Sequence, residues 1–142
     1  MTARELEALQ EVLAAEHAVV YGYGVAGARL AGAARTAATT GWESHRASRD
    51  DLSTLVTRLG GEPAAGAATY ALPSPVGTAE HARALLVLLE ERLAAVWADA
   101  VTALRGDLRD VAVTGLARAA ASAARWRGTS VAFPGLPERT VD

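Results

Sequence analysis

Apolar residues recur three and four positions apart over four long segments of the chain, which is the spacing of one face of an α-helix. The inward positions of the first segment are Leu6, Leu9, Leu13, Glu16, Val20, Tyr23, Gly27 and Leu30, and those of the second are Ala38, Gly41, His45, Ser48, Leu52, Leu55 and Leu59. The third contains Ala82, Leu86, Leu89, Leu93, Val96, Ala100 and Ala103, and the fourth contains Leu108, Ala112, Leu116, Ala119, Ala123 and Trp126. No segment alternates with period two for long enough to predict a strand. The pattern therefore predicts an all-α protein with four helices.

Capping residues mark where these helices begin and end. Thr78 precedes the third apolar segment and is a predicted N-cap, because its hydroxyl can accept from a free backbone N–H. Gly60 and Gly61 follow the second segment, and Gly128 follows the fourth, where glycine readily adopts the left-handed conformation that ends a helix. The fourth helix is accordingly predicted from about residue 107 to 127.

The connections between the helices predict how they are ordered. Short links in the Gly32–Arg35 region and at residues 105–106 fit two antiparallel hairpins. The link at about residues 60–78 is too long for a simple up-and-down bundle, and it can span the length of a helix. We therefore predict a ferritin-like four-helix bundle, with two antiparallel helix hairpins joined by this long crossover loop. Residues 1–142 are expected to form one domain, with a C-terminal tail, 129–142, packed on it.

One motif offers a different interpretation of the first segment. The letters VVYGYGVAG at residues 19–27 contain G-x-G-x-x-G, and Glu43 lies about 20 residues on, where a dinucleotide-binding fold has its ribose-binding acid. That motif requires a strand before the glycines, and the helical spacing already runs through them from Leu6. We favour glycines inside a helix. Gly24 and Gly27, each with an alanine four residues on, would let a neighbouring backbone approach closely.

Composition narrows the possible partners. The net charge of −2 over 142 residues gives no electrostatic case for nucleic acid. No apolar run is long enough to span a bilayer, which predicts no membrane partner, and the N-terminus has no leader signal, which predicts a cytoplasmic protein. The absence of cysteine excludes disulfides, thiolate metal sites and thiol catalysis.

Two polar residues interrupt the apolar faces of the first and second helices. Glu16 and His45 occupy inward positions, where an acid or an imidazole is costly unless it is paired. The first interpretation is a buried hydrogen-bonded cluster of Glu16 and His45, with Tyr23 and Arg49 as further members. The alternative is that these residues bind a metal ion.

The metal interpretation follows the pattern of di-metal bundles, in which two helices each supply a Glu and two supply Glu-x-x-His. Glu16 and His45 match two of these ligands, and Glu90 on the third helix matches a third. Trp42 stands where the carboxylate partner of His45 belongs, and residues 111–127 contain no Asp, Glu or His. The sequence thus predicts no di-iron site and no cofactor. A single Fe, Mn or Zn ion held by Glu16, His45 and Glu90 is the alternative.

Several longer motifs resemble one family. They are AAEHAVVYGYG in the first helix, HRASRDDL in the second, YALPSPV in the crossover, LLEERLAAVWA in the third helix and RWRGTSVAFPGLPE at the end. With these motifs the chain resembles the actinobacterial ferritin-like domain-of-unknown-function proteins over nearly its whole length. The resemblance implies a ferritin-like bundle, a homodimer and a largely lost metal site, and it implies no reaction.

Three hypotheses for function remain, and no catalytic residue is predicted for any of them. The first is a non-catalytic structural or interaction bundle. The second is a metal-binding, oxidoreductase-type ferritin-like protein that retains Glu16, His45 and Glu90 as ligands. The third is a bundle that binds a small apolar ligand between its helices, where small side chains leave room.

Overall fold

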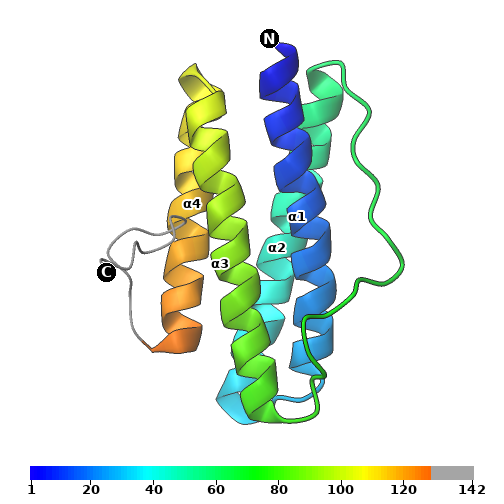
Figure 1. Ribbon diagram of the computed structural model, residues 1–142, viewed down its shortest axis with the longest axis vertical. Coiled ribbons are helices and arrows are strands. Elements are labelled where there is room, and N and C mark those ends of the chain that lie inside the picture. The colour runs from blue at the N-terminus through cyan, green and yellow to red at the C-terminus, as the bar shows by residue number, and fades with distance from the viewer. Residues whose placement is uncertain (129–142) are drawn as a thin grey trace, which may run out of the picture.

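Four long helices make up the part of the chain that the computed structural model describes, residues 1–128 (Figure 1). They are α1 (Ala3–Gly27), α2 (Gly32–Arg58), α3 (Ala79–Ala103) and α4 (Gly106–Arg127). No strand occurs within residues 1–128, which confirms the predicted all-α class and places the G-x-G-x-x-G motif inside α1. The predicted packing of the tail, 129–142, concerns residues outside this range.

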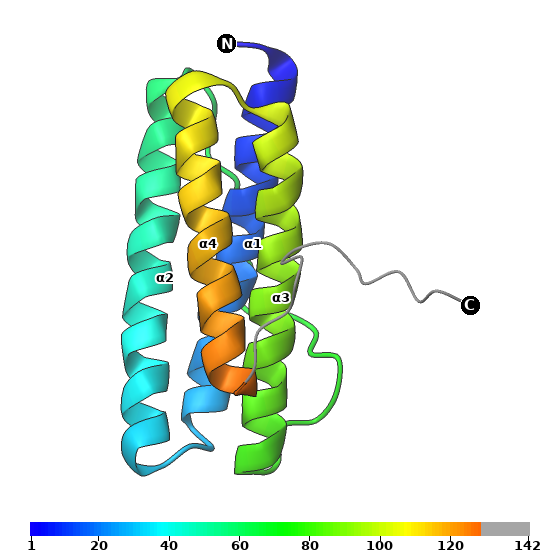
Figure 2. The same cartoon turned by 90° about the vertical axis from the view of Figure 1, so that its left-hand side faces the viewer.

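The helices form two antiparallel hairpins joined by one crossover, as Figures 1 and 2 show. A short turn connects α1 to α2. After the end of α2 the chain runs back along the length of the bundle, and α3 begins near the start of α2. The first turn lies slightly earlier than predicted. It spans residues 28–31, and the Gly32–Arg35 region is already the first turn of α2, entered through Gly32 at φ +57°.

The predicted helix ends are confirmed by their capping interactions. The hydroxyl of Thr78 accepts a hydrogen bond from the backbone N–H of His81 at 3.1 Å. Gly60 after α2 and Gly128 after α4 have φ values of +87° and +88°, which lie in the left-handed region. The start of α1 carries a capping box between Thr2 and Glu5 that the pattern of apolar positions did not reveal.

Burial is shared unequally among the helices. α1 packs against α2 and α3, and α3 packs against α4, whereas α2 and α4 do not pack against one another. Nine residues of α1 and nine of α3 are buried, against three of α2 and three of α4. α1 and α3 therefore form the central pair of the bundle, and α2 and α4 flank it.

Individual core positions differ from the predicted face in α1. Val19 is buried where Val20 was expected, and Val20 is only half-buried. Gly24 is exposed with open space around it, so its predicted role in close helix approach is wrong. The glycine that packs is Gly22, because a side chain there would meet Leu89 of α3.

The crossover is held against α1 by two polar side chains. The amide of Gln10 donates to the carbonyl of Glu62 at 2.5 Å and accepts from the backbone N–H of Ala64 at 2.8 Å. A ring nitrogen of His17 lies 2.9 Å from the carbonyl of Ala64. These contacts give the loop a fixed path near its start. None of the helices within residues 1–128 is both long and apolar enough to cross a membrane.

Candidate functional site: a buried imidazole between two carboxylates

His45 of α2 lies between a carboxylate of α1 and a carboxylate of α3. Its Nδ1 is 2.8 Å from Oε2 of Glu16, and its Nε2 is 2.6 Å from Oε1 of Glu90. The side chains of Glu16 and Glu90 are 2% and 0% exposed, and that of His45 is 12% exposed. One imidazole thus bridges three helices at the middle of the bundle.

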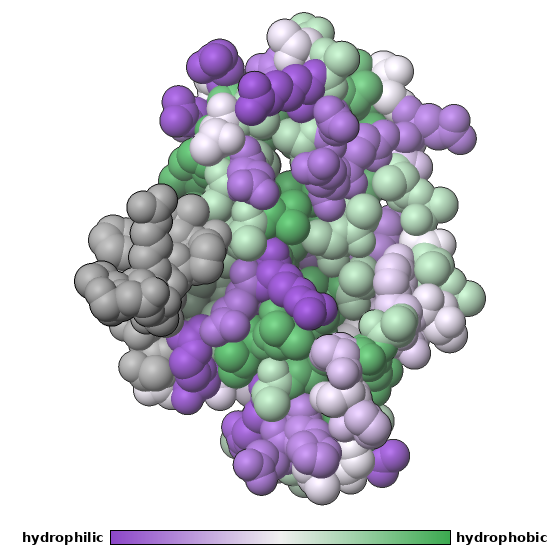
Figure 3. Space-filling view, viewed as in Figure 1, coloured by the Kyte–Doolittle hydropathy of each residue, from purple (hydrophilic) through white to green (hydrophobic). Residues whose placement is uncertain are grey.

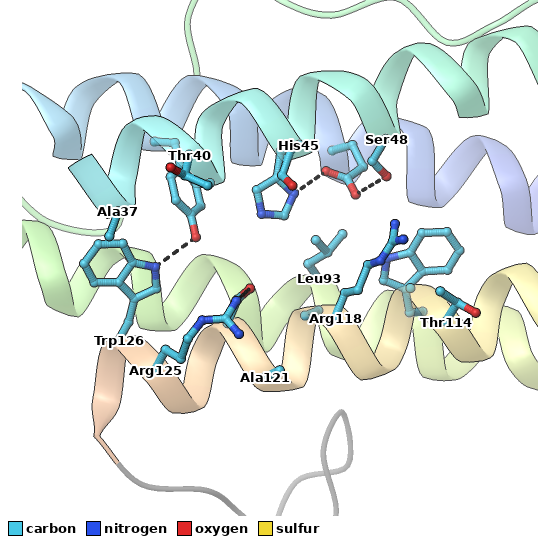
Figure 4. Close-up of a pocket in the computed structure, with 18 of the residues that line it drawn as sticks. Ala37, Thr40, His45, Ser48, Leu93, Thr114, Arg118, Ala121, Arg125 and Trp126 are labelled. Carbon is cyan, nitrogen blue, oxygen red and sulfur yellow. Dashed lines mark hydrogen bonds and ion pairs between the residues drawn. The ribbon is translucent and has the colours of Figure 1, made fainter. Parts of the chain in front are cut away.

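The hydrogen bonds continue from this centre to the fourth helix. The hydroxyl of Tyr23 donates to Oε1 of Glu90 at 2.5 Å. The same hydroxyl accepts from the indole N–H of Trp126 at 3.0 Å, the bond that is drawn at Trp126 in Figure 4. On the other side, the hydroxyl of Ser48 donates to Oε1 of Glu16 at 2.8 Å. Together with His45 these residues form a network with at least one member from each helix, which we call the buried network (Glu16, Tyr23, His45, Ser48, Glu90 and Trp126).

The buried network favours a protonated imidazole. Burial alone lowers the pKa of His45, but the hydrogen bonds and charges of Glu16 and Glu90 outweigh it and raise the pKa to about 10. Both ring nitrogens can then donate, one to each carboxylate. Burial and the charge of Glu90 also raise the pKa of Tyr23 above its ordinary value, so this hydroxyl remains a donor at neutral pH.

One atom of the buried network has no partner. Oε2 of Glu90 is buried and makes no hydrogen bond, although the other oxygen of this carboxylate meets both Tyr23 and His45. Two carboxylates and one imidazolium leave the group one negative charge in excess. A buried acceptor left unpaired costs on the order of 1–3 kcal/mol. The position therefore favours a donor or a cation at Glu90.

The structure brings together most of the residues singled out in the sequence. Glu16, Tyr23 and His45 lie in one cluster, and Glu90, which the sequence offered as a metal ligand, is fully buried beside them. Arg49 lies outside the cluster, because its guanidinium pairs with Asp50 at 2.8 Å instead. This arginine does not belong to the buried network.

Two members of the network were missed. Ser48 and Trp126 both stood in the predicted inward faces, but nothing in their spacing showed that they would donate to Glu16 and Tyr23. Ser48 could have been predicted as a member by the same criterion as His45, because both are polar residues at inward positions of the second helix. Glu91, the neighbour of Glu90 in the sequence, is exposed, and its carboxylate pairs with Arg127.

The donor set does not fit a pair of metal ions. Oε1 and Oε2 of Glu16 accept from Ser48 and His45, and both nitrogens of His45 are engaged with carboxylates. Residues 1–128 contain no group of three or more His, Asp or Glu side chains arranged to hold a metal ion. Binding even one ion would require His45 to lose its proton and release one of its carboxylates.

A groove runs over this network between α2 and α4. Because these two helices do not pack together, they enclose a cavity of about 1320 Å³ that opens to solvent. Its walls carry small side chains of α2 and α4, and its floor includes Glu16, Tyr23, Leu93 and Trp97 from the central pair. The opposite side of the molecule, seen in Figure 3, has apolar and hydrophilic residues interspersed around its middle.

Two glycines let aromatic rings form this floor. A side chain at Gly41 of α2 would collide with the ring of Tyr23, and one at Gly115 of α4 would collide with the indole of Trp97. Each ring thus lies against the backbone of a flanking helix. The glycines therefore permit the inward position of the two aromatic residues.

The fold and the site define a four-helix bundle with one long crossover and a buried carboxylate–imidazole–carboxylate group. The chain belongs to the family described as Domain of unknown function (DUF4439), whose model matches residues 8–138. It is similar to a conserved hypothetical protein, rv2844, from Mycobacterium tuberculosis, known from a crystal structure. The identity is 32%, the alignment covers 90% of this chain and 98% of that chain, and the TM-score is 0.86. None of the curated proteins matches the chain.

Proposed function

We propose that this protein is a non-catalytic, ferritin-like bundle that has lost a di-iron site and binds a small molecule in the groove between α2 and α4. The observation that carries the proposal is the groove itself. Two of the four helices bury only three residues each and leave about 1320 Å³ between them, over an aromatic floor. Ligand sites of helical bundles commonly lie between helices, with mostly apolar walls and a few polar groups.

The loss of metal chemistry is supported by the composition of α4. Residues 111–127 contain no acid and no histidine, so the side of the bundle formed by α4 offers no ligands for a second ion. The buried network instead joins the four helices by hydrogen bonds between charged and neutral groups. In this proposal its function is to hold the floor of the groove in one arrangement.

The groove can be tested by filling it. Ala121 and Ala117 are both exposed residues of α4, but only Ala121 lines the groove. We expect Ala121→Trp to abolish the stabilisation that ligands from a small-molecule library give in a thermal-shift screen, whereas Ala117→Trp preserves it. Equal responses of the two variants to every stabilising compound would refute a binding function for the groove.

A second function, binding of one divalent cation, is favoured by the unpaired Oε2 of Glu90. Mn²⁺ and Zn²⁺ titrated into the protein would then bind at about one equivalent per chain and release a proton from His45. Glu16→Ala and His45→Ala would lose the ion, and Glu91→Gln, on the exposed side of α3, would retain it. Absence of Fe, Mn and Zn from protein purified without chelator, together with no heat of titration, would eliminate this function.

The family resemblance also leads us to propose a homodimer. Light scattering during size-exclusion chromatography measures this directly. A mass of one chain at micromolar concentration would contradict it.

A further inference from the structure

Two arginines of α4 line the groove between α2 and α4, and neither of them forms an ion pair within residues 1–128. Arg118 and Arg125 stand seven residues apart on α4, which places them on the same face two turns apart. Figure 4 shows both side chains extending from α4 into the space between the helices. Within residues 1–128, Arg118 makes no hydrogen bond or ion pair, and Arg125 makes a single bond, to the hydroxyl of Ser122 at 3.0 Å. Both arginines are exposed, and most of their donors have no protein partner within residues 1–128.

The carboxylate in the floor of the groove does not satisfy these donors. Both oxygens of Glu16 already accept hydrogen bonds, from Ser48 and from His45. His45 also lines the groove, but both of its ring nitrogens already lie within hydrogen-bond distance of a carboxylate, so the imidazole offers no further donor. The unused hydrogen-bonding capacity of this section consists mainly of cationic donors.

The remainder of the lining is mixed: it includes apolar side chains, Arg83 near the start of α3, and two aspartates at one end of the groove. Leu52, Leu55 and Trp97 lie toward the end of the groove where α2 finishes and α4 begins. Asp51 and Asp110 lie at this same end, and both are exposed. An anionic group is therefore attracted to the section with Arg118 and Arg125 and repelled from the end with the two aspartates.

We propose that the groove binds an anionic amphipathic molecule, a long-chain carboxylate, with its acid group on Arg118 and Arg125 and its chain directed toward Leu52 and Trp97. This inference rests on the proposed binding function of the groove and specifies its ligand class. Guanidinium groups recognise carboxylates through paired N–H donors, and the acid supplies the acceptors that they lack. The hydrocarbon chain of the ligand covers the apolar end of the groove, which is otherwise exposed to water.

A pair of fluorescent probes tests the charge requirement. The first is 11-(dansylamino)undecanoic acid, and the second is its methyl ester, which has the same chain without the charge. Binding is followed by the rise in dansyl emission and by energy transfer from Trp97 and Trp126. We expect the acid to bind wild-type protein roughly tenfold or more tightly than the ester, the factor that corresponds to one charge-assisted hydrogen bond.

Variants assign this preference to particular side chains. The double variant Arg118→Ala/Arg125→Ala is expected to bind acid and ester equally, while Arg109→Ala, an exposed arginine of α4 outside the groove, keeps the preference. Arg118→Lys is expected to retain part of it. Circular dichroism and the unfolding midpoint of each variant show that the bundle is intact.

The outcomes distinguish failure of the proposed ligand class from failure of the proposed binding function of the groove. Equal binding of acid and ester by wild-type protein, with both blocked by Ala121→Trp and not by Ala117→Trp, overturns the carboxylate and leaves the binding function standing. An acid preference that survives loss of both arginines overturns the assignment to Arg118 and Arg125. If neither probe binds, and Ala121→Trp converts a wild-type dimer to a monomer, a second copy of the chain occupies the groove and the inference is wrong.

Discussion

The indole N–H of Trp126 donates to the hydroxyl of Tyr23, 103 positions earlier in the chain, over 3.0 Å. The two residues belong to α4 and α1, which do not pack against one another in the bundle. Tyr23 passes the interaction on to Glu90 of α3. A single hydrogen bond thus links the end of α4 to the charged centre of the molecule, across the floor of the groove.

Replacing Trp126 by Phe should test this link with little change in apolar packing. We expect the free energy of unfolding to fall by about 0.5–1.5 kcal/mol, the usual net value of such a hydrogen bond. Urea denaturation followed by circular dichroism gives the value. Trp42→Phe is a suitable control, because the indole of Trp42 contacts the guanidinium of Arg46 and makes no hydrogen bond within residues 1–128. Equal losses in the two variants would mean that the bond to Tyr23 contributes nothing.

The protonation of His45 predicts that stability falls in alkaline solution. The pKa of His45 rises from 6.5 to about 10 on folding, so between these values the folded state holds a proton that the unfolded state has released. The contribution is complete below about pH 6.5 and is lost as the pH rises toward 10, by an amount on the order of a few kcal/mol. Denaturant midpoints measured from pH 6 to pH 9.5 should therefore decrease steadily.

His45→Gln should remove most of this decrease, since it removes the ionisable ring that lies against Glu16, Glu90 and Tyr23. His81→Gln, on an exposed residue of the first turn of α3, should leave the decrease intact. A wild-type profile that is flat to pH 9.5 would show that His45 is not protonated in the folded protein.

The charged centre should be easier to replace as a whole than to break. His45→Ala leaves Glu16 and Glu90 buried without a counter-charge, and we expect a loss of about 3–5 kcal/mol, as for other buried ion pairs that lose one partner. The triple variant Glu16→Met/His45→Leu/Glu90→Met removes every charge and should unfold at or above the wild-type denaturant concentration. A triple variant as unstable as His45→Ala would indicate that the polar contacts themselves stabilise the fold.

Two glycines within helices should respond to alanine in opposite directions. Gly24 is exposed with open space around it, so Gly24→Ala should stabilise α1 by up to about 1 kcal/mol through helix propensity. Gly115 faces the indole of Trp97, and Gly115→Ala should cost about 1–3 kcal/mol because the rigid ring must shift. Thermal unfolding of the two variants would compare them directly, and a shift of the same sign in both would contradict the packing described.

The sequence was sufficient for the helices and for part of the site, for identifiable reasons. Helix ends were predictable at Thr78, Gly60 and Gly128 because capping depends on local backbone chemistry. Glu16 and His45 were predictable because a polar residue in an apolar face requires a partner. Their exact partners were not predictable, since the spacing of apolar residues along α3 does not fix how far the side chain of Glu90 turns toward α2.

The groove could not be predicted from the same pattern. Apolar residues with period 3.6 show that α2 and α4 each bury one face. They do not show that α2 packs against α1 and α4 against α3, with no packing between α2 and α4. The small side chains of α2 and α4 were visible in the sequence, and so were Arg118 and Arg125. These residues line one cavity because α2 and α4 are held apart, and the separation of the two helices cannot be derived from the sequence pattern.

The central pairing of α1 and α3 has a consequence for how the molecule opens. Most buried residues belong to these two helices, so their amide hydrogens should exchange last, and those of α2 and α4 should exchange earlier. Within residues 1–128 the groove opens to solvent along one side of the bundle, which gives a ligand a lateral route to Tyr23 and Trp97.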